Sequence, residues 1–212
     1  MNSDSFLKRL ALGAGVGLIA MVAYDGIQYS TIGRAVLRQD CWSWQCVSFN
    51  PAWVWPYESM FILAGLPWFL LPTLRDAQRF AVALLATAAV AWVVFVAYPT
   101  ACVRPSTVGQ PTYYVLLRVF DQANNCMPCL HSALSLVTAW SLVSEQTIFA
   151  RFGGKLSLVI WLAVVSVSIV ALRQHTGVDI MAGFALGGVG AWLFSALRNH
   201  GPGGAIESAY PR

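Results

Sequence analysis

The stretch Phe80–Tyr98, FAVALLATAAVAWVVFVAY, decides the fold class of this chain. It contains no charged residue, and as a helix rising about 1.5 Å per residue it would cross a hydrocarbon core of about 30 Å. Other apolar stretches of comparable length run approximately over Leu7–Gly26, Ala52–Leu71, Pro128–Val143, Leu156–Leu172 and Val178–Leu197. The sequence therefore predicts an all-α polytopic membrane protein, folded as a bundle of six transmembrane helices.

The composition supports this class and excludes others. Of the 212 residues, 58% are hydrophobic and only 10% are charged, whereas a soluble domain carries about 25% charged residues. The formal net charge is +4 without a basic run, so no nucleic-acid partner is expected, and the lipid bilayer is the predicted environment. We expect one membrane domain over residues 1–198 and a disordered cytoplasmic tail over residues 199–212, which contains Gly201-Pro202-Gly203-Gly204.

The positions of the basic residues predict the orientation in the membrane. If successive stretches cross the membrane in alternating directions, the basic residues on one side are Lys8, Arg9, Arg75, Arg79, Arg151, Lys155 and Arg198. Those on the other side are Arg34, Arg38, Arg104, Arg118 and Arg173. Positive charge in short loops marks the cytoplasmic side, so both termini are predicted inside, in a bacterial-type inner membrane. A cleaved signal peptide is the alternative interpretation of the first stretch.

Two regions have a finer pattern. The fourth stretch carries small hydroxyl residues at Ser132, Ser135, Thr138 and Ser141, which is typical of a helix surrounded by other helices. Aromatic residues crowd the outer end of the second stretch, as in an interfacial belt, at Trp42, Trp44, Trp53, Trp55 and Tyr57.

Two of the three histidines lie at the outer ends of predicted helices. His131 lies where the long outer loop enters the fourth stretch, and His175 lies just before the sixth. One crossing inward and one crossing back separate them, so both imidazoles return to the same membrane face. Asp179 follows His175 by four residues, a spacing that puts both on one helical face and lets the carboxylate orient the ring. The alternative is a pair that only caps the sixth helix.

Around these histidines are residue types that suit the binding of a phosphate ester. Phosphate oxygens need positive charge and N–H or O–H donors, which Arg104, Arg173, Ser132 and the first turn of the fourth helix can supply. Each arginine can also be read as a solvated interfacial charge.

Two segments carry a resemblance to a known family. Pro128-Cys129-Leu130-His131-Ser132 and His175-Thr176-Gly177-Val178-Asp179 resemble signatures of the type 2 phosphatidic acid phosphatase superfamily, in the branch with inositol phosphorylceramide synthase. Arg104-Pro105 looks like the end of a further signature, and six spans match the usual core. The resemblance implies that His175 is a nucleophile that becomes phosphorylated, that Asp179 orients it, and that His131 is the general acid.

The chain departs from the family pattern at several positions. Ala97 stands in place of a lysine, Cys129 in place of a serine, and Ile169, after Ser168, in place of an arginine. Arg173 would substitute for that arginine from another turn. The expected partners are a phosphorylated lipid (polyprenyl, glycero- or sphingolipid phosphate) and, in a transferase, a hydroxyl acceptor. No cofactor and no metal are expected, and the site would face the periplasm.

The cysteines allow a second interpretation. All of them fall on the outer side, at Cys41, Cys46, Cys102, Cys126 and Cys129, where disulfides can form. Cys41 could pair with Cys46, and Cys102 with Cys126 or Cys129. Cys126-x-x-Cys129 is also typical of membrane thiol oxidoreductases, for which a helix terminus would lower the pKa of Cys129. A non-enzymatic transporter with histidines as proton relays is the third hypothesis.

Overall fold

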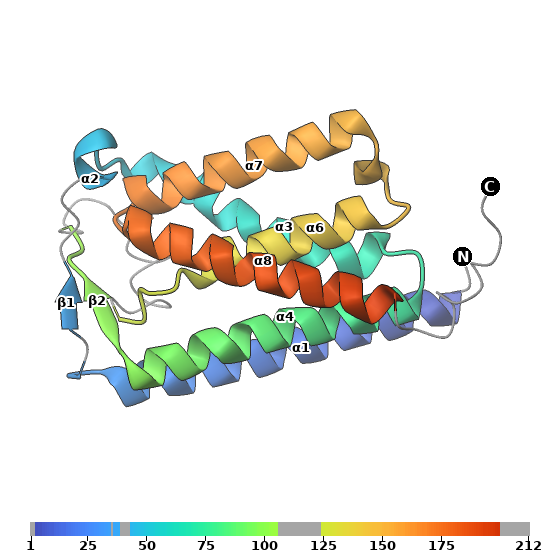
Figure 1. Cartoon of the computed structure of the whole chain (residues 1–212), viewed down its shortest axis with the longest axis horizontal. Helices are drawn as coiled ribbons and strands as arrows, with labels where there is room; N and C mark the ends of the chain where they lie inside the picture. The colour runs from blue at the N-terminus through green and yellow to red at the C-terminus, as the bar shows by residue number, and fades with distance from the viewer. Residues whose placement is uncertain (1–2, 35, 39–42, 106–123, 200–212) are drawn as a thin grey trace.

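The computed structural model describes residues 3–34, 36–38, 43–105 and 124–199, and most of this part of the chain is helical. Long helices run alternately up and down a bundle, so that α1 begins and α8 ends at the same end (Figure 1). Their bounds are α1 Ser3–Thr31, α3 Val54–Leu70, α4 Leu74–Ala97, α6 Leu130–Ser144, α7 Phe152–Ala171 and α8 Gly177–Asn199.

These helices coincide with the apolar stretches in the sequence, and the all-α class is confirmed. Four of them, α1, α4, α7 and α8, are long and apolar enough to cross a membrane. The other two are shorter, since α3 has 17 residues and α6 has 15. The predicted tail began at Asn199, which instead ends α8, and its remaining residues, including His200, lie outside the described residues, as do Cys41, Trp42 and Arg118.

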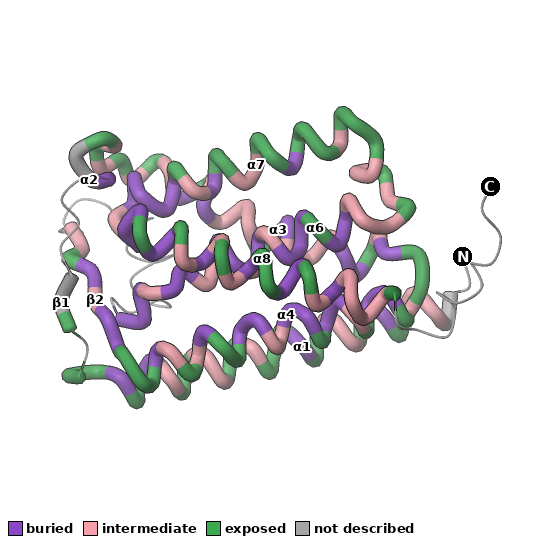
Figure 2. The backbone as a smooth tube through the Cα atoms, viewed as in Figure 1, coloured by how far each residue is buried: buried purple, intermediate pink, exposed green. Residues whose placement is uncertain are grey.

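The outer faces of the bundle are apolar. Figure 2 shows buried positions toward the interior and exposed positions along the outside of α1 and α7. Large side chains such as Phe61, Val93 and Trp192 are more than half exposed, at 61%, 68% and 68%. Water-soluble monomers rarely expose contiguous apolar faces of this extent, whereas helices that contact lipid do. The structure therefore fits a lipid bilayer environment.

Helix α6 packs closely against α8, and small residues explain why it can. Ser132, Ser135, Thr138 and Ser141 are all buried, which confirms that the fourth stretch is surrounded by other helices. On α8, a Cβ added at Gly187 would lie 2.6 Å from the carbonyl oxygen of Ala133 on α6. Such glycines let two backbones approach closely, as in helix pairs within membranes.

Short elements close one end of the bundle, which we call the strand end. There α1, α4 and α7 finish, and α3, α6 and α8 begin (Figure 1). Strand β1 (Val36–Arg38) pairs in parallel with β2 (Thr100–Cys102), and thereby ties the segment after α1 to the segment after α4. Helix α2 (Ser43–Cys46) and the 3-10 turn η1 (Pro51–Trp53) complete this end.

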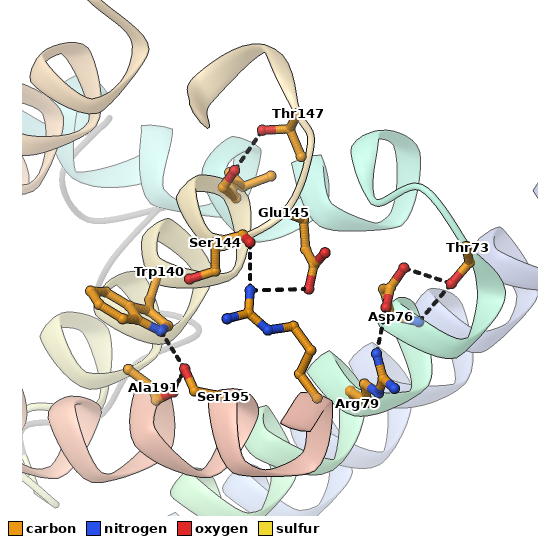
Figure 3. A network of polar contacts seen from close by, with 11 residues as sticks. Thr73, Asp76, Arg79, Trp140, Ser144, Glu145, Thr147, Ala191 and Ser195 are labelled. Carbon is orange, nitrogen blue, oxygen red and sulfur yellow. Dashed lines mark hydrogen bonds and ion pairs between the residues drawn. The ribbon is translucent and has the colours of Figure 1, made fainter. Parts of the chain in front are cut away.

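The opposite end contains a polar network, part of which is seen in Figure 3. Arg79 pairs with Asp76 at 2.8 Å, and Arg198 donates to the carbonyl oxygen of Ser144 at 2.6 Å and lies 3.9 Å from Glu145. Another 3-10 turn, η3 (Ile148–Ala150), connects α6 to α7 here. Arg198, one of the basic residues predicted on the cytoplasmic side, therefore joins the end of α8 to the end of α6, whereas the Arg79–Asp76 pair lies within the first turns of α4.

Candidate active site

Two histidines from distant parts of the chain meet at the strand end. His131 lies in the first turn of α6, and His175 lies in the connection between α7 and α8. His131 Nδ1 is 3.1 Å from His175 Nε2, and the two rings meet edge to face with centroids 5.3 Å apart. His175 is buried and His131 is half-buried. The structure thus brings together the two imidazoles that the sequence placed at one membrane face.

Hydrogen bonds fix the protonation pattern of this pair. His175 Nδ1 lies 2.7 Å from the carbonyl oxygen of Cys126, which can only accept, so Nδ1 carries a hydrogen and donates it. Nε2 of a neutral His175 therefore has a lone pair, toward which His131 Nδ1 donates. His131 Nε2 lies 2.6 Å from the hydroxyl of the buried Tyr57, which donates to it when His131 is neutral. A continuous chain of hydrogen bonds runs from Tyr57 to Cys126.

The segment that carries the Cys126 carbonyl is held from two sides. Cys126 N–H donates to the backbone oxygen of Thr100 at 3.2 Å, and Met127 N–H donates to the Thr100 hydroxyl at 3.0 Å. Cys129 N–H donates to the backbone oxygen of Asp179 at 2.9 Å. Strand β2 and the start of α8 therefore both position the acceptor that orients His175.

Asp179 is buried at the start of α8. Its carboxylate accepts from Thr176 N–H at 2.8 Å, and its own N–H donates to the Thr176 hydroxyl at 3.3 Å. This reciprocal pair is a capping box at the start of α8. The Cys126 carbonyl accepts from His175 Nδ1 at 2.7 Å. Because α8 begins at Gly177, His175 precedes the helix, and the orienting role of Asp179 toward His175 stays a prediction.

Arg173 has an unusual backbone conformation just before His175. Its φ is 57°, in the left-handed region that L residues rarely adopt. Arg173 N–H donates to the oxygen of Val170 at 3.0 Å, and Gln174 N–H donates to the oxygen of Ile169 at 3.1 Å. This is a Schellman motif at the end of α7, with arginine where glycine is usual. The motif turns the chain sharply and presents His175 to α6.

Arg104, the other predicted phosphate ligand, follows β2 and is half-buried. It is close enough to Cys126 that its charge acts to lower the pKa of that thiol. A hydrogen bond with Cys102, and then burial, outweigh this effect, so the pKa of Cys126 is raised. The charge of Arg104 therefore acts on Cys126, and its role in phosphate binding stays a prediction.

Ser132 lies directly after His131, but its hydroxyl forms hydrogen bonds where α6 packs against α8. Its hydroxyl lies 3.0 Å from the backbone oxygen of Cys129 and 3.2 Å from that of Ile180, and both of these oxygens accept. The side chain is buried, and a Cβ added at Gly183 would lie 2.2 Å from its oxygen. Since the one hydroxyl hydrogen is used between α6 and α8, the contribution of Ser132 to phosphate binding stays a prediction.

The cysteines that the structure describes are thiols, at Cys46, Cys102, Cys126 and Cys129. Burial raises the pKa of Cys129 to about 12, above its ordinary value of 9.0. The expectation that the helix terminus would lower this pKa is therefore wrong, because the loss of hydration outweighs the helix dipole. A thiol of this kind is a poor nucleophile at neutral pH.

Three side chains at the site offer metal-ligand atoms that the sequence did not group. Cys129 Sγ, His131 Nδ1 and His175 Nε2 all lie within 4.8 Å of one another. Cys129 Sγ is 4.0 Å from His131 Nδ1. The sequence predicted no metal site here, because Cys129 and His131 lie at the start of α6 and His175 lies in the α7–α8 connection, far apart along the chain.

Two partners of the histidines were not predicted from the sequence. Tyr57 was expected in an interfacial aromatic belt, whereas its side chain is 2% exposed and its hydroxyl contacts His131. Trp55, two residues earlier, is 67% exposed and has the position expected of the belt. The second partner, the backbone carbonyl of Cys126, cannot be predicted from the sequence, because every residue has a backbone carbonyl.

Comparisons with known proteins leave the site to be interpreted from its geometry. The chain matches no protein-family model, no curated protein and no solved structure.

Proposed function

We propose that this protein is an integral-membrane lipid phosphatase or phosphotransferase that forms a phosphohistidine at His175. The observation that carries the proposal is the contact between His175 Nε2 and His131 Nδ1, with His175 Nδ1 held by the Cys126 carbonyl. This arrangement leaves a lone pair on the nucleophilic nitrogen and an N–H directly beside it. It also agrees with the resemblance of the two histidine segments to the type 2 phosphatidic acid phosphatase superfamily.

In the proposed reaction, the lone pair of His175 Nε2 attacks the phosphorus of a phosphorylated lipid. The bond from phosphorus to the leaving oxygen breaks, and that oxygen takes the Nδ1 hydrogen of His131, which acts in its imidazolium form with its Nε2–H donating to the Tyr57 oxygen and returns to the neutral form. Water or a hydroxyl acceptor then attacks the phosphohistidine, and His131 Nδ1 takes back a hydrogen from the attacking oxygen. Arg104 and Arg173 would neutralise the phosphate oxygens. Asp179 would fix the start of α8 beside the nucleophile.

The distance between the histidines implies that the site opens for its substrate. The attacking nitrogen needs phosphorus at about 3–3.5 Å, and the acid needs the leaving oxygen at about 2.6–3.2 Å. With the P–O bond between them, the two ring nitrogens must be roughly 6 Å or more apart. They lie 3.1 Å apart in this structure. A bound lipid phosphate must therefore part the two rings.

The proposal includes an orientation in the membrane. Six helices would span a bacterial-type inner membrane with both termini cytoplasmic, and the strand end would face the periplasm. The alternating course of the helices and the basic residues at the end opposite the histidines support this arrangement. Lipid phosphates would reach His131 and His175 from the outer leaflet.

The test uses purified full-length protein in detergent, incubated with polyprenyl, glycero- and sphingolipid phosphates. We expect phosphate release from at least one lipid, and transfer when a hydroxyl acceptor resolves the intermediate. His175→Ala should abolish release and also prevent radiolabelling of the protein by a labelled substrate. His200→Ala, in the remaining histidine, is the matched control. Turnover by His175→Ala at the rate of the control would refute the proposal.

A second variant separates the roles of the two histidines. His131→Ala should slow hydrolysis of a lipid phosphate by about 10²–10⁴-fold, because a poor leaving group needs an acid. With an aryl phosphate, whose leaving group needs little protonation, the loss should be much smaller. Equal losses with both substrates would contradict the general-acid role.

The sequence alternatives give different results in the same experiments. A thiol oxidoreductase would lose activity on Cys129→Ala and keep it on His175→Ala. The raised pKa of Cys129 works against that alternative, since the thiolate is the reactive form. Intact turnover after substitution of both His131 and His175 by alanine would instead point to a transporter.

A further inference from the structure

The ligand atoms of Cys129, His131 and His175 form a compact triangle. His131 Nδ1 lies 3.1 Å from His175 Nε2 and 4.0 Å from Cys129 Sγ, and the third separation is within 4.8 Å. Cys129 and His175 are buried, and His131 is half-buried. One thiol and two imidazoles are the ligand types that zinc prefers in proteins.

The size of the triangle matches a zinc ion more closely than it matches a phosphoryl group. Zinc binds sulfur at about 2.3 Å and imidazole nitrogen at about 2.0–2.1 Å, so tetrahedral ligands are about 3.3–3.6 Å apart. The nitrogen pair differs from this by a few tenths of an ångström. To reach this spacing, the Cys129 sulfur must approach His131 Nδ1 by about 0.4 Å and His175 Nε2 by at most about 1.2 Å, which a rotation of the Cys129 side chain can supply.

The surroundings of both histidines also suit metal binding. A histidine that binds a metal usually donates its other N–H to a carbonyl, a carboxylate or a similar acceptor, which fixes the ring. His175 Nδ1 donates to the Cys126 carbonyl at 2.7 Å, which leaves Nε2 for the metal. His131 Nε2 faces the Tyr57 hydroxyl at 2.6 Å, which can accept when Nδ1 is the ligand. Both outer partners already lie within hydrogen-bond distance of the histidines.

We propose that Cys129, His131 and His175 form a zinc-binding site with three protein ligands and a fourth position for water. On binding, the Cys129 thiol releases its proton to solvent and Sγ bonds to the metal. The hydrogen on His131 moves from Nδ1 to Nε2, where the Tyr57 oxygen accepts its hydrogen bond. A bound zinc ion would be coordinated by His131 Nδ1 and His175 Nε2, the same two nitrogen atoms that act in the proposed phosphoryl transfer.

One consequence rests on the proposed function. If His175 is the nucleophile, zinc must inhibit turnover, because metal and phosphorus compete for His175 Nε2. Cys129 has no part in that phosphoryl transfer, so it acts on the reaction only by retaining the metal. Metal binding itself does not depend on the enzyme being a phosphatase.

The test begins with binding rather than activity. Metal-free full-length protein in detergent is titrated with Co²⁺, a spectroscopic substitute for Zn²⁺. We expect one equivalent to bind, with a thiolate-to-cobalt charge-transfer band that Zn²⁺ abolishes by displacement. Cys129→Ser should remove the band, and His175→Gln should lower the affinity for Zn²⁺ by at least about tenfold. Cys102 is a buried thiol outside the triangle, so Cys102→Ser is the matched control. This variant should keep the charge-transfer band and the affinity for Zn²⁺.

Several results would overturn the metal site. These are no charge-transfer band in the wild type, a band that survives Cys129→Ser, or a band that Cys102→Ser removes equally. Thermal unfolding without metal checks that each variant is folded, and Zn²⁺ should raise the midpoint of the wild type and of Cys102→Ser only. Inhibition by Zn²⁺ is measured separately, relative to the metal-free rate of each protein. If the wild type binds Zn²⁺ but hydrolyses no lipid phosphate, the proposed function fails and the metal site stands.

Discussion

Replacement of Gly183 by alanine should disturb the candidate site through the backbone alone. Gly183 lies on α8, where a Cβ would be 2.3 Å from the carbonyl oxygen of Cys129 and 2.2 Å from the Ser132 hydroxyl oxygen. The serine can rotate, but the Cys129 carbonyl belongs to the segment that leads into α6. Relief of the clash requires α8 to move from α6 by about 1 Å, since ordinary contacts begin near 3.4 Å.

The magnitude follows from the cost of overpacking. An added methyl group without space typically costs about 1–3 kcal/mol. For a chain of this size, each kcal/mol lowers the unfolding midpoint by about 2–4 °C, so we expect a decrease of about 2–12 °C. Phosphate release should fall as well, because a 1 Å displacement of reacting groups can cost about 100-fold in rate.

Gly188→Ala provides the control for this prediction. It lies on the same helix, and a Cβ there would meet nothing within 4 Å. Alanine has the higher helix propensity, so this variant should be as stable as the wild type or more stable. The assay is thermal unfolding in detergent together with phosphate release from the best lipid phosphate. Equal midpoints for Gly183→Ala and Gly188→Ala would falsify the close-packing argument.

Three further predictions concern the site and its thiols. Tyr57→Phe should lower the free energy of unfolding by about 1–3 kcal/mol, because His131 Nε2 loses its buried hydroxyl donor; an unchanged denaturation midpoint would contradict this. Arg173→Gly should raise stability by about 1 kcal/mol by relieving the left-handed backbone, yet lower phosphate release; a less stable glycine variant would argue against backbone strain. At pH 8, Cys129 should be alkylated about a thousandfold more slowly than the exposed thiol Cys46, because its pKa is about 12 and its thiolate fraction is correspondingly small. Its rate should increase as the pH is raised toward that value, as mass spectrometry of alkylated peptides can follow, and equal rates at pH 8 would be inconsistent with burial of the Cys129 thiol.

The two proposals for the site describe different uses of the same closed arrangement. With 3.1 Å between His131 Nδ1 and His175 Nε2, the gap suits a single metal ion, whereas phosphoryl transfer needs a wider one. A lipid phosphate that opens the pair would expel the metal. Zinc that closes the pair would exclude the lipid.

The sequence by itself determined the fold class and the approximate helix bounds. Apolar stretches such as Phe80–Tyr98 predict helices because a chain in lipid must satisfy its backbone hydrogen bonds locally. The sequence also predicted that His131 and His175 lie at the same end of the bundle, since two membrane-crossing helices separate them. The hydroxyl residues of the fourth stretch correctly indicated a helix surrounded by others, because small polar side chains are unfavourable toward lipid.

Only the tertiary structure decided what each side chain at the site contacts. The start of α8 at Gly177 leaves His175 outside the helix, so the Cys126 carbonyl orients the ring and Asp179 caps α8. The contact of Tyr57 with His131 spans 74 positions along the chain, and no local pattern encodes it. Local hydropathy and spacing report what one segment does by itself. The partners of a buried nitrogen depend on how separate helices pack, and that is a property of the whole bundle.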